Sequence, residues 1–62
     1  MVHANKLRQF KVYGVVKGEN VEKYLGTFGM VCTPLYGESE AKKMYRANAR
    51  KIRVVEFDNN NQ

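Results

Sequence analysis

The chain has few of the residues that stabilise small proteins through disulfides or bound metal ions. Among its 62 residues there is one cysteine, Cys32, one histidine, His3, one proline and no tryptophan. A single cysteine excludes an internal disulfide, and one cysteine with one histidine cannot supply the four ligands of a structural zinc site. We therefore expect no metal and no cofactor, and a stability that comes from packing or from a partner.

Long apolar runs are also missing. No stretch approaches the roughly 18 consecutive apolar residues of a membrane span. Residues 1–9 lack the apolar core and the small-residue cleavage site of a secretory signal. Because a lone cysteine suits a reducing compartment, we expect a cytoplasmic protein with no membrane partner.

Signatures of catalysis are absent too. A chain of 62 residues forms one domain close to the lower size limit for a self-supporting core, and its 44% apolar content is enough for that core alone. The glycines form no phosphate-cradling loop. No orienting acid is indicated for Cys32 with His3, so Cys32 is expected to be a buried thiol. We expect a protein that is not an enzyme.

Three segments share the apolar alternation of strands, namely residues 7–16, 21–33 and 52–57. In the first, Phe10 and Val12 lie on one face, and Lys11 and Tyr13 lie on the other. Its periodicity therefore predicts that one face packs in the core and that the face with Lys11 and Tyr13 lies outside the core.

The second predicted strand is interrupted by Gly26 and Gly29. These glycines indicate either bulges in one strand or two short strands that meet near Gly26. In either case the same face is expected to carry Tyr24, Phe28, Met30 and Cys32.

A helix is expected from about residue 38 to residue 48 or 50, after the chain leaves the sheet over residues 33–37. Ser39 or Gly37 would cap it, and two glutamates in its first turn would suit the helix dipole. Its inner face is predicted to hold Ala41, Met44, Tyr45 and Asn48. Its outer face is predicted to hold Lys42, Lys43, Arg46 and Arg50.

The element order predicts a small α+β domain of ββαβ type over residues 7–58, with flexible tails at 1–6 and 59–62. Three mainly antiparallel strands would form one sheet, and one helix would pack on one face. The other face would then meet solvent, pair with a second copy or bind a partner, so a homodimer is one option.

The strongest functional signal is the distribution of charge. The net charge is +5, and six of the eleven Lys and Arg residues fall between Lys42 and Arg53, where no acidic residue interleaves. Such a run repels itself and adds nothing to a core, but an anionic partner would bind it. We therefore predict a nucleic-acid-binding protein, for RNA or DNA of mixed sequence.

The predicted contact residues belong to two groups. Phosphate contacts are assigned to Lys42, Lys43, Arg46, Arg50 and Arg53. Secondary candidates on the sheet are Lys11 and Tyr13, which would use a cation and an aromatic ring to hold a single strand.

The alternative function is a small protein-binding inhibitor or adaptor, of the kind used by phages or in regulation. Its basic surface would dock on an acidic surface of a larger enzyme, for example one that processes nucleic acid. The little-charged segment Leu25–Leu35 would favour this alternative, because an apolar strand edge can accept a partner strand.

One short motif is similar to a known one. Phe28-Gly29-Met30-Val31 resembles the Phe-Gly-x-Val part of the RNP1 motif of RNA-recognition domains. The basic-Gly start and the other aromatic positions of the motif are not present here, so no residue role is taken from the resemblance.

Overall fold

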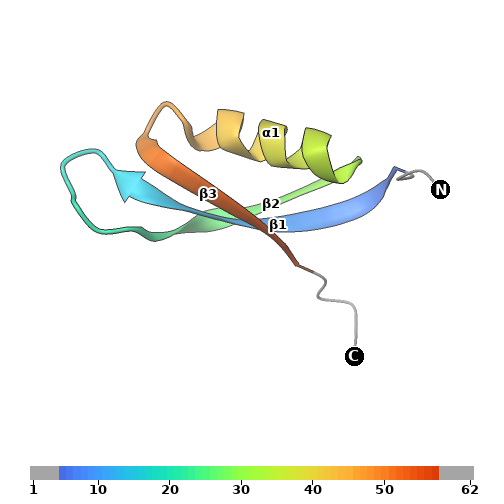
Figure 1. Ribbon diagram of the computed structural model, residues 1–62, viewed down its shortest axis with the longest axis horizontal. Coiled ribbons are helices and arrows are strands. Elements are labelled where there is room, and N and C mark those ends of the chain that lie inside the picture. The colour runs from blue at the N-terminus through green and yellow to red at the C-terminus, as the bar shows by residue number, and fades with distance from the viewer. Residues whose placement is uncertain (1–4, 58–62) are drawn as a thin grey trace.

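The computed structural model describes residues 5–57, which form one sheet and one helix (Figure 1). The elements in chain order are β1 (Lys6–Val16), β2 (Lys23–Cys32), α1 (Pro34–Tyr45) and β3 (Ala49–Phe57). The strand order is β2-β1-β3, and β1 is antiparallel to both neighbours. The predicted α+β fold is confirmed.

The predicted tails are only partly covered by the described residues. The tail at 59–62 lies outside them, and so does most of the tail at 1–6. Lys6 is already part of β1, one residue before the predicted start of that strand.

The core lies between α1 and the covered face of the sheet. Its buried side chains are Phe10, Val12, Val15, Cys32 and Ala41. Phe10 also packs against the ring of Phe28 on β2, with the ring centroids 6.3 Å apart. Full burial of such side chains contributes about 1.5–3 kcal/mol each, so a core of this size leaves the domain little stability to spare.

The glycine-containing second segment is one strand with one bulge. Val12 faces Gly26 and Tyr13 faces Tyr24, so Leu25 is the extra residue on β2. Gly29 keeps a regular register opposite Gln9 and makes no bulge. The extra residue reverses the alternation, so the prediction that Tyr24 shares a face with Phe28 is wrong.

The helix begins earlier than its predicted start near residue 38. Thr33 occupies the N-cap position with no side-chain cap, Pro34 follows in the first turn, and the Gly37 amide donates to the Thr33 carbonyl at 3.0 Å. Proline is tolerated there because the first amides of a helix have no partner within it. Residues 33–37 are therefore not an exit loop, and no acidic residue lies in the first turn.

The helix also ends earlier than predicted. It stops at Tyr45, and β3 begins at Ala49 instead of Ile52, so Arg50 is a strand residue. A helix that starts at Pro34 turns Gly37 and Ala41 toward the sheet. Ala41 is buried as predicted, whereas Met44 is 57% exposed and was wrongly assigned to the inner face.

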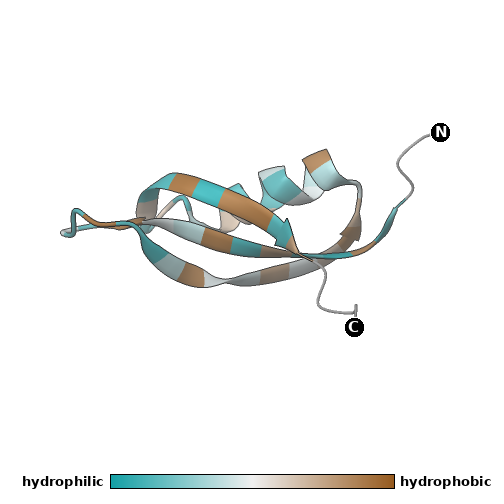
Figure 2. Cartoon of the chain, turned by 60° about the horizontal axis from the view of Figure 1, so that its bottom comes forward, coloured by the Kyte–Doolittle hydropathy of each residue, from teal (hydrophilic) through white to brown (hydrophobic). Residues whose placement is uncertain are grey.

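The face of the sheet away from α1 is uncovered within the described chain, and we call it the open face (Figure 2). Its members alternate with the core residues along each strand. They are Leu7, Gln9, Lys11 and Tyr13 of β1, Tyr24, Thr27, Gly29 and Val31 of β2, and Arg53, Val55 and Phe57 of β3. It mixes apolar and polar side chains, as the colouring shows.

Gly37 generates a stability prediction, because it is the point of closest approach between helix and sheet. A Cβ at this position would lie 2.5 Å from Cζ of Phe10 and 2.6 Å from Sγ of Cys32. Overpacking of this kind costs about 1–3 kcal/mol, partly offset by about 1 kcal/mol of helix propensity. Gly37→Ala is expected to lower the free energy of unfolding by up to about 2 kcal/mol, measured by urea denaturation.

Gly29→Ala is the control for that variant. A Cβ at Gly29 would meet nothing closer than 3.8 Å, so no loss is expected. A Gly37→Ala protein that is more stable than the wild type would show that the helix can move off the sheet at no cost.

Candidate nucleic-acid interface

The passage from α1 into β3 gathers basic side chains that the sequence separates. A shallow hollow of about 240 Å³ lies there, lined by Lys42, Arg46, Ala49, Arg50, Lys51 and Ile52. Lys42 and Arg46 come from the helix and its C-cap, whereas Arg50 and Lys51 come from the start of β3. The three predicted residues Lys42, Arg46 and Arg50 therefore do lie together, although Arg50 is not on the helix.

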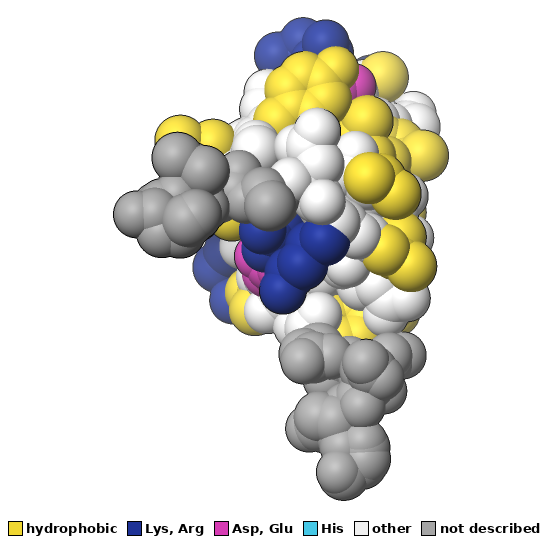
Figure 3. Space-filling view, turned by 90° about the vertical axis from the view of Figure 1, so that its right-hand side faces the viewer, with side chains coloured by type: hydrophobic (Ala, Val, Ile, Leu, Met, Phe, Trp, Pro, Cys, Tyr) yellow, Lys and Arg dark blue, Asp and Glu magenta, His cyan; other side chains and the backbone are white. Residues whose placement is uncertain are grey.

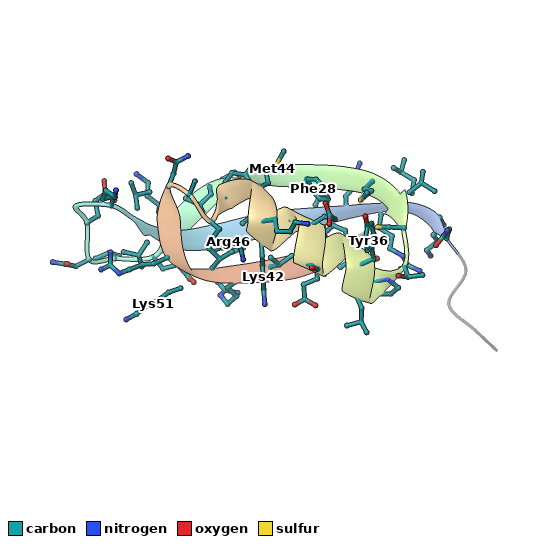
Figure 4. The ribbon with its side chains drawn as sticks, turned by 90° about the horizontal axis from the view of Figure 1, so that it is seen from above. Phe28, Tyr36, Lys42, Met44, Arg46 and Lys51 are labelled. Atoms are coloured by element: carbon teal, nitrogen blue, oxygen red, sulfur yellow. The ribbon has the colours of Figure 1, made fainter. Side chains whose placement is uncertain are left out.

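A second hollow adjoins the first and adds a cation from the residue that directly follows β1. It has a volume of about 160 Å³ and is lined by Val15, Lys17, Arg46, Ala47, Asn48, Ala49 and Arg50. Lys17 reaches this place because its amide donates to the Asn48 carbonyl at 3.4 Å. We call Lys17, Lys42, Arg46, Arg50 and Lys51 the basic cluster; Figure 4 shows three of its members.

No carboxylate of the described chain lines either hollow. Four glutamates pair with cations elsewhere, in the ion pairs Arg8–Glu56, Lys23–Glu19, Lys43–Glu40 and Arg53–Glu22. Within residues 5–57 no ion pair involves the basic cluster. Arg50 donates to a backbone carbonyl, that of Glu19, at 3.3 Å, which leaves its charge unopposed.

Part of this arrangement has a purely structural role. Cations near a helix C-terminus are stabilised by the helix dipole, so the position of Arg46 at the C-cap and of Lys42 in the last turn needs no ligand. The dipole falls off within one turn, however, and it does not account for Arg50, Lys51 and Lys17. The surplus charge is what indicates an anionic partner.

Lys51 has an unusual backbone. Its φ is 53°, in the left-handed region that lysine rarely adopts, beside the register shift between β1 and β3. The shift places an extra residue on β3 between Arg53 and Arg50, and the chain turns there. A lysine in this left-handed conformation, which suits glycine, lowers the stability of the fold by about 1 kcal/mol. The Lys51 side chain is therefore held at the rim of the cluster at some loss of stability.

Three predicted residues lie on the open face, on the other side of the sheet from α1. Arg53 pairs with Glu22 through two hydrogen bonds of 2.9 and 3.1 Å and lies over the Tyr13 ring at 4.5 Å. Lys11 lies over the Phe57 ring at 5.0 Å. Arg53 therefore does not flank the helix cations, because alternation along β3 turns it to the opposite face.

Lys43 lies on the helix but outside the cluster. Its ammonium is 3.2 Å from the Glu40 carboxylate, and the pair is formed by residues one turn apart. An exposed pair of this kind contributes little to stability, but it neutralises the charge that Lys43 would offer to a ligand.

The Glu22–Arg53 pair has a titration consequence. The hydrogen bonds and charge of the Arg53 guanidinium lower the pKa of Glu22 below its ordinary value of 4.5, and Glu22 in turn raises the pKa of Arg53. Both groups are solvent-exposed, so the pair orders the open face near the hairpin more than it stabilises the fold.

Two members of the cluster were missed by the sequence prediction. Lys51 belonged to the basic run and was signalled by it, but it was not assigned a contact. Lys17 had no local signal, because only the pairing of β1 with β3 brings it beside Asn48. The RNP1-like segment places its aromatic ring differently from that motif: Phe28 packs on Phe10 beneath the helix, whereas the aromatics of the motif stack on bases from an open sheet face.

Residues 5–57 contain neither a metal-binding cluster nor a membrane-spanning helix. No group of three or more His, Cys, Asp or Glu side chains there could hold a metal ion. No helix in the same range is long and apolar enough to cross a membrane. No protein-family model, curated protein or solved structure matches the chain.

The backbone of Lys51 generates a prediction about stability. Lys51→Gly removes the left-handed penalty, whereas Lys51→Ala removes the same charge and keeps the penalty. Lys51→Gly is expected to be more stable than Lys51→Ala by about 1 kcal/mol in urea denaturation. Equal stabilities would show that the chain relaxes out of the left-handed conformation in solution.

The lowered pKa of Glu22 generates a prediction about pH. Since the folded pKa lies below the ordinary 4.5, the stabilisation by the pair is complete above that value and is lost as pH falls through the folded pKa. Glu22→Gln should lack this acid-dependent part, so its stability and that of the wild type should converge at low pH. Chemical denaturation between about pH 2 and pH 7 measures this.

Arg53→Gln is the partner variant for that measurement. It should abolish the same acid-dependent part of the free energy of unfolding. The double variant should lose no more of this stability than either single variant does. A wild-type pH profile that Arg53→Gln leaves unchanged would contradict the pairing in solution.

Proposed function

We propose that this chain is a non-enzymatic, cytoplasmic protein that binds RNA or DNA through the phosphate backbone, with the basic cluster as its contact surface. One observation carries the proposal. Five cations from three separate segments surround two adjoining hollows, while the ion-paired glutamates of the described chain engage cations outside the cluster.

The donors of the cluster suit phosphate. Arg46 and Arg50 offer planar guanidinium groups that can hold a phosphate through two parallel hydrogen bonds, and they line both hollows. The lysines around them act as point charges that follow a flexible backbone. Release of condensed counterions from the nucleic acid then drives the association.

The same geometry argues against reading a base sequence. The hollows are shallow, and the side chains that line them are basic or apolar apart from Asn48, the one lining amide that could contact a base edge. Contacts to phosphate fix a protein on the chain without selecting bases. We therefore assign binding to mixed sequence and no defined site.

The remaining predicted contacts are given smaller roles. Arg53 and Lys43 are already paired with glutamates, so their charges contribute less to binding. Lys11 and Tyr13 lie on the open face, and a strand that touched them and the cluster would have to pass around the sheet. They are secondary contacts at most.

The proposal is tested by titration of nuclease-treated protein against labelled single- and double-stranded RNA and DNA at two salt concentrations. Arg46→Glu/Arg50→Glu is expected to weaken binding at least about tenfold, because it removes the two cations that line both hollows. In the wild type, affinity should fall with salt, with a log–log slope of about −0.7 to −0.9 for each phosphate neutralised. The double variant should show a shallower slope.

Lys6→Glu/Lys23→Glu is the matched control, since it changes the net charge equally on exposed residues of β1 and β2 outside the cluster. It should weaken binding much less than the cluster variant. Equal losses in the two variants would contradict a localised site, and no binding at low salt would reject the proposal. In the latter case the cluster would be tested as a docking site for an acidic protein.

A further inference from the structure

The two edges of the sheet differ in a way that the proposed function does not use. The strand order leaves one side of β2 and one side of β3 unpaired within residues 5–57. The β3 edge carries four charged residues, Arg50, Lys51, Arg53 and Glu56. β2 carries only Lys23, at its first position, and no charged residue occurs from Tyr24 to Gly37.

Unpaired edges in native proteins are normally protected by charges, prolines or bulges, because an exposed ladder of amides and carbonyls accepts another strand. β3 has both charge and a bulge beside Lys51. β2 has one bulge, at Leu25 near the hairpin, and then a regular register from Gly26 to Cys32. That regular, uncharged stretch lacks protection.

Exposed apolar side chains flank the same edge. Val31 on the open side of β2 is 64% exposed, and Tyr36 and Met44 on α1 are 53% and 57% exposed. Phe28 and Met30 lie between them, half-buried. Figure 4 shows Met44 and Phe28 on the β2 side of the helix, and Figure 3 shows hydrophobic atoms gathered along that side of the molecule.

We propose that two copies of this chain pair through the outer edges of their β2 strands, antiparallel, to form a dimer with one six-stranded sheet. A second copy fits this edge because the edge is uncharged after Lys23, so pairing it sets no cation of one chain against a cation of the other. Two such chains repel across their cationic surfaces, and this border lets them approach. An isologous contact needs a patch that is complementary to itself, and an uncharged strand edge meets that condition.

The helices support this pairing. A two-fold axis normal to the sheet places both copies of α1 on the same face, above β1 of each copy, with three strand spacings of about 4.8 Å between them. That separation of about 14 Å exceeds a helix diameter of about 10–12 Å by a small amount. The gap is of the size that Tyr36 and Met44 can fill.

The direction of the strands decides which of these side chains meet. Antiparallel pairing sets the start of one helix beside the end of the other, so Tyr36 of one copy lies toward Met44 of the second. A thioether beside an aromatic ring is a favourable contact. The ion pair Lys43–Glu40 on this helix flank adds no net charge to the interface.

The proposal also covers exposed apolar surface that the monomer leaves in water. The buried hydrophobic core of the described chain is Phe10, Val12, Val15, Cys32 and Ala41, so further burial matters for a domain this small. Pairing through β2 leaves the basic cluster free, because the cluster is built on α1's end and on β3.

The test compares two variants that flank the same residue. Thr27 and Val55 both pair with Lys11 on the open face, one on each edge strand. Thr27→Lys puts a charge at the middle of the β2 edge, and Val55→Lys puts the same charge on β3. Sedimentation equilibrium over a concentration series measures the dimer dissociation constant, and far-UV circular dichroism confirms that each variant is folded.

The wild type should dimerise, Thr27→Lys should raise the dissociation constant at least about tenfold, and Val55→Lys should leave it nearly unchanged. A monomeric wild type at several hundred micromolar would overturn the proposal. So would equal losses in both variants, which would assign the contact to the open face, or a loss in Val55→Lys alone, which would assign it to β3.

Amide hydrogen exchange on the wild type tests the same edge without any substitution. As protein concentration rises, amides of β2 should exchange more slowly, whereas amides of β3 should not change. Protection that rises on β3 or on neither strand would contradict a β2 contact. These readouts do not involve nucleic acid, so they can fail while the proposed function stands, and the reverse also holds.

Discussion

The structure depends on how closely α1 approaches the sheet. Gly37 leaves room for the ring of Phe10 and the thiol of Cys32, and Ala41 continues the same small face one turn later. A larger side chain at Gly37 would lift the helix from β1. The close packing of Gly37 and Ala41 on the sheet fixes the direction of α1, and therefore the point at which the chain turns into β3. The hollow between Arg46 and Arg50 exists because that turn brings the helix end against the first residues of the strand.

Charge is distributed on this frame with little overlap between surfaces. Arg8 donates to the Cys32 carbonyl at 2.8 Å and pairs with Glu56, so it ties β2 to β3 across β1. Arg53 and Glu22 pair on the open face. The glutamates in these pairs are thereby withdrawn from the end of α1, where the cations remain unopposed within the described chain. The uncharged edge of β2 and the basic cluster both result from the uneven distribution of charged residues. Because the charges are concentrated on one border of the molecule, another border carries none.

The fold could be predicted because strand alternation and turn residues are local signals. The main errors in the predicted fold arose where one local sequence signal is compatible with two structures. Pro34 ends a strand and also suits the first turn of a helix, and the helix start decides whether Met44 faces the core or solvent. Bulges in one strand at Gly26 and Gly29 were one of two open alternatives; the bulge that forms lies at Leu25, and its reversal of the alternation moves Tyr24 to the other face. Lys17 could not be assigned to the cluster at all, since its position depends on the register of β1 with β3 and on no neighbouring residue.

The two proposals are linked by charge. In the proposed dimer, the two-fold axis that reverses β2 would also place the two basic clusters at opposite ends, so one particle would present two of the proposed phosphate-binding surfaces. Once one cluster holds a nucleic acid, the second contact becomes intramolecular when the strand is long enough to span both, and the overall affinity exceeds that of one cluster without any new interaction. The linkage acts in the other direction as well. Each copy carries a net charge of +5, so a polyanion that neutralises the clusters removes part of the repulsion that opposes pairing through β2.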